Sequence, residues 1–177
     1  MKFNYYAFKA IYLHEMDRFK RTLMQSLLSP VLSTSLYFIV FGSVIGGYVE
    51  NIDGISYGSY IVPGLLMLTL LTQSISNTSF GIFFPKFNGT IYEILAAPIS
   101  TLEIVLAFVG AGATKTLIVG FVIFITATFF VEVEVKYPML MIFLLVLVAF
   151  TFALFGLLAT SKRPVLGVSS MVGREMS

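Results

Sequence analysis

Few residues in this chain could carry out catalysis. A hydrolytic or transfer reaction needs a nucleophile with its base, two neighbouring carboxylates, or a group of metal ligands. The sequence has one histidine, His14, and no cysteine, which excludes a histidine cluster and a thiol site. It also lacks a G-x-x-x-x-G-K-[ST] phosphate-binding loop. We therefore expect a protein that is not an enzyme and has no cofactor of its own.

Lys115 is the one charged residue inside a long apolar stretch. An ammonium group at the centre of a membrane costs several kcal/mol, so such residues often mark an ion pathway. The alternative is that the hydrocarbon core begins near Thr116, in which case Lys115 is a cytoplasmic flank whose side chain reaches back to water. The length of the apolar stretch favours this flank interpretation.

A second group of polar residues lies within another apolar stretch, at 73–79. Their side chains could line a route for a substrate, and they could equally well form hydrogen bonds between neighbouring helices, which is a common use of such groups in membranes. The residues that would line a substrate route are Gln73, Ser76 and Asn77.

The elements that position these residues are predicted to be membrane-spanning helices. Hydrophobic residues make up 58% of the 177, and charged residues only 11%, less than half the usual fraction of about 25%. Four stretches approach the roughly 20 apolar residues that a helix needs to span a bilayer, near 27–47, 60–84, 104–131 and 138–158. The predicted fold is an all-α membrane protein, a polytopic helical bundle. The net charge of +2 gives no indication of nucleic-acid binding.

Basic residues indicate the orientation of the bundle. Lys and Arg gather in the N-terminal segment, occur in the 85–103 segment as Lys86, and recur in the C-terminal tail, whereas the 48–59 loop has two acidic residues and no basic one. By the positive-inside rule, both termini and the 85–103 segment lie in the cytoplasm. The acidic residues expected on the opposite side are Glu50, Asp53, Glu132 and Glu134.

Residues 1–26 are predicted to form an amphipathic helix at the cytoplasmic interface. One stripe of this helix is apolar because its residues recur at spacings of three and four. The stripe consists of Tyr5, Phe8, Tyr12, Met16, Phe19 and Leu23, and the opposite face carries His14, Asp17 and Arg21. The chain would then turn into the membrane at Ser29–Pro30. Packing of this helix on a soluble partner is the alternative.

The 85–103 segment contains a further short helix. Gly89 and Pro98 bracket the sequence TIYEILAA, which is long enough for two helical turns. Ile91, Ile94 and Leu95 would lie on one side of this helix and Glu93 on the other. An apolar face on a cytoplasmic helix indicates a surface that docks on a partner.

The quoted features resemble the membrane-spanning subunits of type-2 ABC exporters, a bacterial permease family. The resemblance rests on Val62–Pro63–Gly64 near the start of the second span, on the pattern of Gly89, Thr90, Glu93, Leu95 and Pro98 after it, and on the basic amphipathic N-terminus. It covers about residues 10–158.

This resemblance implies a partner and a mechanism. In the family, two permease subunits pair with two copies of a separate ATP-binding subunit, which binds the ATP. A short coupling helix between the second and third spans contacts that ATPase, and by position it falls here on Thr90, Ile91, Glu93, Ile94, Leu95 and Pro98. The expected function is therefore export across the bacterial inner membrane by a multi-pass permease subunit that forms a homodimer. The alternatives are a secondary transporter or channel, and a membrane scaffold that does not transport.

One departure from the family concerns the C-terminus. Members usually have six spans, whereas the apolar pattern here ends with the fourth. We therefore expect a permease domain at 27–158, followed at 159–177 by a polar tail that is foreign to the family, as a shortened or frameshifted reading frame would produce.

Overall fold

The computed structural model describes residues 4–45, 57–131 and 137–161. These residues form helices and no strands. In chain order the elements are α1 (Tyr5–Arg21), α2 (Leu23–Tyr37), a π-helical segment η1 (Phe38–Ile45), α3 (Tyr57–Phe87), α4 (Thr90–Ala96), α5 (Thr101–Phe130) and α6 (Pro138–Ser161).

Four helical stretches are long and apolar enough to cross a membrane, at Leu23–Phe41, Ser59–Phe87, Thr101–Phe130 and Pro138–Thr160. They coincide with the four predicted spans to within a few residues, which confirms the all-α polytopic fold. The four acidic residues expected on the outer side, Glu50, Asp53, Glu132 and Glu134, lie outside the described residues, as does the tail from residue 162 onward.

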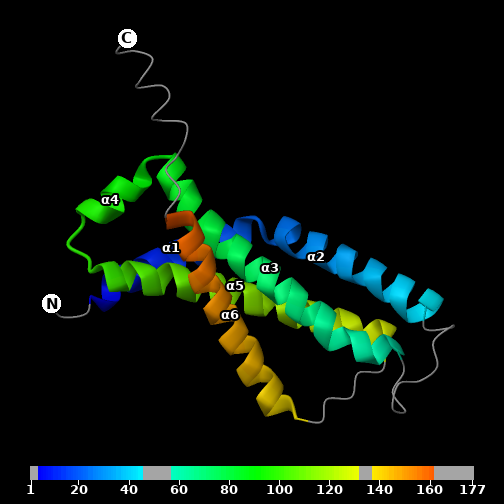
Figure 1. Ribbon diagram of the computed structural model, residues 1–177. Coiled ribbons are helices and arrows are strands. Elements are labelled where there is room, and N and C mark those ends of the chain that lie inside the picture. Colours follow the sequence, from blue (N-terminus) through cyan, green and yellow to red (C-terminus); the bar gives the residue numbers. More distant parts are fainter. Residues whose placement is uncertain (1–3, 46–56, 132–136, 162–177) are drawn as a thin grey trace.

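The helix α5 is the centre of the bundle. In its most apolar stretch 56% of the residues are buried, against 17–22% in the other three spans. Small residues such as Ala107, Ala111 and Ala113 allow the neighbouring helices to approach α5 closely. Figure 1 shows α3 and α5 passing through the middle of the bundle, with α2 along one side and α6 crossing on the other.

Packing of α3 against α6 also depends on a small residue. A Cβ atom added to Gly156 would lie only 2.6 Å from the carbonyl oxygen of Ile75. Two hydroxyl groups of α3 reinforce this close approach by donating to carbonyl oxygens of α6: Ser74 donates to Ala149 at 2.5 Å, and Ser79 donates to Gly156 at 3.1 Å. These serines therefore join helices, as expected for hydroxyl groups in a membrane.

The N-terminal region is divided differently from the prediction. The helical structure is interrupted at Thr22, which lies between the end of α1 and the start of α2. The predicted turn at Ser29–Pro30 is therefore wrong. Pro30 instead lies buried inside α2. The break at Thr22 separates the basic last turn of α1 from the apolar run that begins at Leu23.

The amphipathic pattern of α1 is largely confirmed. Phe19 is buried, while Phe8, Tyr12, Met16 and Leu23 are half-buried. Tyr5 departs from the prediction because it is exposed. The predicted polar face is exposed at His14, Asp17 and Arg21.

We predict that Gly156→Ala destabilises the bundle because its methyl group would push α6 away from the backbone of α3. Overpacking of this kind costs about 1–3 kcal/mol. Thermal unfolding of the detergent-purified protein, followed by circular dichroism, measures the effect. Gly64→Ala is the matched control, since no atom lies within 4 Å of the added Cβ. An equal unfolding midpoint for both variants would contradict this packing.

Candidate functional site

A buried carboxylate, Glu15, lies at the contact between α1 and α5. One of its oxygen atoms, Oε2, is 2.7 Å from Lys115 Nζ and 2.8 Å from Arg18 Nη2. Glu15 and Lys115 are 2% and 4% exposed, and the Arg18 side chain is 28% exposed. We call Glu15, Arg18 and Lys115 the charged cluster.

The charged cluster forms because α1 runs parallel to the first half of α5. Further contacts follow the same order along both helices. The backbone N–H of Asn4 donates to Glu103 Oε1 at 2.6 Å, and Tyr12 Oη donates to Thr114 Oγ1 at 3.0 Å. Beyond the cluster, Phe19 packs with Val119 and Ile123. The helix α1 is therefore fixed to α5 along its whole length.

The helix α3 closes the charged cluster from another side. A Cβ atom added to Gly81 of α3 would lie 3.4 Å from Glu15 Oε2, in van der Waals contact with the carboxylate. The guanidinium of Arg18 lies 5.8 Å from the ring centroid of Phe84, also on α3. Such a cation–π contact favours a guanidinium that is partly removed from water.

Lys115 does not reach water as the flank interpretation expected. Its ammonium group is buried and turned towards Glu15. The flank interpretation is wrong because it treated the third span in isolation, whereas α1 supplies a carboxylate beside it. An isolated buried charge is costly, and a paired one is much less so.

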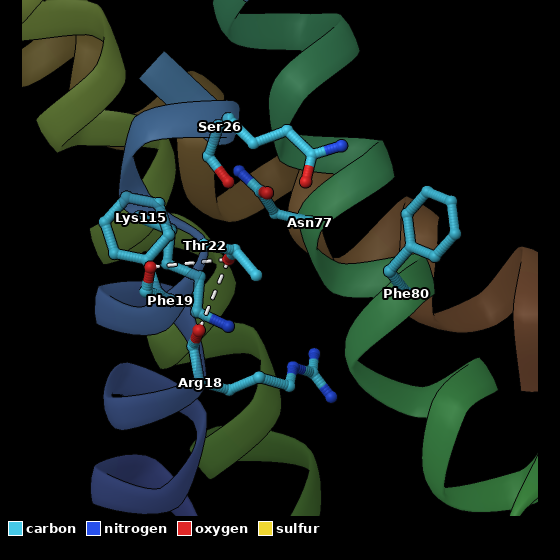
Figure 2. A pocket seen from close by; sticks show the side chains of 8 residues that line it. Arg18, Phe19, Thr22, Ser26, Asn77, Phe80 and Lys115 are labelled. Carbon is cyan, nitrogen blue, oxygen red and sulfur yellow. Dashed lines mark hydrogen bonds between the residues drawn. The ribbon is translucent and has the colours of Figure 1, made fainter. Parts of the chain in front are cut away.

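A cavity of about 320 Å³ opens beside the charged cluster. Figure 2 shows Arg18, Thr22 and Ser26 on one wall and Asn77 and Phe80 of α3 on the facing wall. The full lining is Arg18, Phe19, Thr22, Gln25, Ser26, Asn77, Phe80 and Lys115. Cationic, amide and hydroxyl groups thus face one space between α1, α2, α3 and α5.

The predicted substrate-route residues do not meet in one place. Asn77 lines the cavity beside the charged cluster, and its Nδ2 donates to Thr116 Oγ1 at 3.4 Å. Gln73 lines a second cavity of about 290 Å³ between α2 and α3. Ser76 is exposed and lines neither cavity. Their assignment to a substrate route stays a prediction.

The predicted short helix is present as α4, at the end of the bundle that also holds the start of α5 (Figure 1). Gly89, with φ at +78°, makes the left-handed turn that begins α4. Ile91 and Ile94 are half-buried, while Glu93 is exposed as expected. Leu95 is 62% exposed, so α4 leaves this side chain uncovered, and its place on the same side as the two isoleucines stays a prediction.

The remaining predicted residues of this segment, Thr90 and Pro98, are both exposed. Tyr92, which the prediction did not include, is 73% exposed and adds an aromatic ring to the outer surface of α4. We call Tyr92, Glu93 and Leu95 the α4 surface.

Glu15 was not predicted as a site residue, although its position in the sequence carries a signal. Glu15 is three residues after Tyr12 and four before Phe19, so the helical period places it on the apolar stripe. An acidic residue on such a stripe needs a buried cation as its partner. The intramembrane Lys115 is a natural candidate for that cation.

The structure thus defines a polytopic helical membrane domain with a short external helix between its second and third spans. A sequence model of the family described as "ABC-2 type transporter" matches residues 6–173. The chain belongs to this family. The match continues past Leu158, where the sequence analysis placed the end of the resemblance.

The chain is also similar in sequence to individual bacterial proteins. Over 152 residues the chain is 39% identical to the inner membrane transport permease YadH of Escherichia coli strain K12, and to the protein of the same name from Shigella flexneri. This alignment covers 86% of the chain and 59% of either relative. Nodulation protein J of Neorhizobium galegae is 26% identical over 121 residues, or 67% of the chain and 46% of that protein. The chain therefore spans about three-fifths of the length of YadH. No solved structure matches it.

We predict that Glu15→Gln destabilises the protein more than Lys115→Gln does. Removing the carboxylate leaves two cations facing each other, whereas removing the ammonium leaves Glu15 paired with Arg18. Breaking a buried charge pair from one side typically costs about 3–5 kcal/mol. Unfolding midpoints in detergent give the order of the two variants.

The control for this comparison is Asp17→Asn on the same helix. Asp17 pairs with Lys20 at 3.1 Å, but both side chains are well exposed, at 60% and 68%. Such a pair contributes about 1 kcal/mol or less. If Lys115→Gln proved as damaging as Glu15→Gln, the shared carboxylate would not be the centre of the cluster.

Proposed function

We propose that this chain is the permease part of an ATP-driven exporter and that α4 transmits force from a separate ABC ATP-binding subunit. The observation that carries this proposal is the α4 surface. A helix of seven residues stands outside the bundle, with Tyr92 and Leu95 exposed beside Glu93. Exposed aromatic and aliphatic side chains around a single charge are typical of a protein contact.

The position of α4 supports a cytoplasmic location for it. In the described part of the chain, the basic residues outside the charged cluster are Lys9, Lys20 and Arg21 on α1 and Lys86 at the end of α3. Lys86 lies in the last turn of the helix that precedes α4, and α1 lies along the half of α5 that follows α4 in the chain. An excess of basic residues favours the cytoplasmic side, where ATP is available to a partner.

Contacts at both ends of α4 support a mechanical role. It begins directly after α3, at the Gly89 turn, and packs on α3. After α4, the backbone N–H of Ser100 donates to Glu103 Oε2 at 3.0 Å. Glu103 also accepts the hydrogen bond from Asn4 at the start of α1. A push on α4 would therefore move α3, α5 and α1 together, as a rigid-body rocking of the spans requires.

The names of the relatives support the cellular setting. Because YadH is named an inner membrane transport permease, we infer an inner-membrane location. The basic residues of α1 favour a cytoplasmic N-terminus. The complete assembly would be a permease homodimer with two ATP-binding subunits that bind the ATP. This chain would be its non-catalytic membrane part.

We predict that Glu93→Lys combined with Leu95→Asp abolishes co-purification of the cognate ATP-binding subunit. The double variant reverses the charge and removes the apolar contact of the α4 surface without touching the bundle. The assay co-expresses both subunits in a bacterial host and pulls down the tagged permease from detergent extracts.

Met139→Ser is the matched control. Met139 is 82% exposed near the start of α6, at the opposite end of the bundle, so its loss should leave the complex intact. Retention of the ATP-binding subunit by the α4 double variant would exclude α4 as its contact.

A further inference from the structure

The charged cluster is not electrically balanced. It contains two cations, Lys115 and Arg18, and the single carboxylate of Glu15, so its formal charge is +1. Both cations contact the same oxygen atom, Oε2. A net charge held in a poorly hydrated region is costly unless a counter-charge lies beside it. The cluster therefore provides a favourable position for an anion.

The adjacent cavity has the composition of an anion site. Lys115 and Arg18 both line it, and none of its eight lining residues is acidic. Gln25 adds an amide donor to the walls. Ser26 and Asn77, both labelled in Figure 2, add a hydroxyl and a second amide. Among the described residues, no hydrogen bond is made by the side chains of Gln25 and Ser26. A group with several acceptor oxygens would find charged and neutral donors around it.

The surroundings of the cavity are apolar and exposed. Phe80, which lines the cavity, is 66% exposed, and Phe84 next to Arg18 is 53% exposed. On the α2 side, Met24 and Leu28 are 80% and 55% exposed on either side of Gln25 and Ser26. These side chains belong to helices of membrane-spanning length. A ligand with an anionic head and hydrocarbon chains would match both the cavity and its rim.

We propose that this cavity binds the anionic head group of a membrane amphiphile, with its phosphate placed between Arg18, Lys115 and the donors of Gln25 and Asn77. The hydrocarbon chains would lie along Phe80 and the exposed apolar residues of α2. The site lies within one chain and requires no ATP-binding subunit, so it does not depend on the proposed coupling role of α4.

The test titrates the detergent-purified full chain with dioleoylphosphatidylglycerol and follows the thermal unfolding midpoint. We expect a saturable increase in this midpoint, because a ligand that binds only the folded state stabilises it. Dioleoylphosphatidylcholine, which has the same chains and a zwitterionic head, is the lipid control. Inorganic phosphate is the control for a free anion.

Two variants locate the binding site. Gln25→Glu places a negative charge on the cavity wall at an exposed position, so the protein should fold while its apparent affinity for phosphatidylglycerol falls by about tenfold. Lys20→Gln removes one positive charge from an exposed position on α1 outside the cavity, and it should change the affinity by less than about twofold.

Three results would overturn the proposal. The first is an equal midpoint increase with phosphatidylcholine, which would indicate general lipid stabilisation. The second is an equal loss of affinity in Gln25→Glu and Lys20→Gln, which would indicate surface charge alone. The third is stabilisation by inorganic phosphate without any by phosphatidylglycerol, which would assign the cavity to a soluble anion. Since the assay contains no ATPase, none of these results bears on α4.

Discussion

The arrangement of this protein depends on one carboxylate that two cations share. Glu15 is buried against two cations, Lys115 and Arg18, and Glu15 is the carboxylate that pairs with Lys115 inside a membrane-length helix. The pair joins residues that are 100 positions apart in the chain. It fixes α1 in register along α5, and Arg18 then reaches the α3 side of the same carboxylate. An amphipathic N-terminal helix thereby becomes part of the bundle instead of a separate attachment to its surface.

The same register connects the N-terminus to the segment that carries α4. Glu103 stands at the start of α5, where it accepts hydrogen bonds from Ser100, just after α4, and from Asn4, just before α1. The starts of α5 and α1 thus meet at one residue, and the charged cluster joins these two helices again about three turns further along. The segment that follows α4 and the cavity beside Lys115 are therefore connected by one helix, α5.

The fold was accessible from the sequence because apolar length alone determines a membrane-spanning helix. The Gly89 turn and the short helix after it were also predictable, since a residue without Cβ favours the left-handed conformation that starts α4. The buried location of Lys115 could not be predicted in this way, because its environment depends on α1, which is distant in sequence. The different exposures of Ile91, Ile94 and Leu95 were not predictable either, because packing of α4 on α3 decides which of its side chains are covered.

Cross-linking in native membranes tests most directly whether α1 lies along α5 in the membrane-embedded protein. The chain contains no cysteine, so the pair Tyr12→Cys and Thr114→Cys can be joined by a short bis-maleimide without background. Their native side chains are 3.0 Å apart at the hydroxyl groups, and we expect efficient intramolecular cross-linking. The pair Tyr12→Cys and Thr151→Cys, with the second residue exposed on α6, should not cross-link. Failure of the first pair in membranes, with both cysteines reactive, would show that α1 lies away from α5 and would contradict the account.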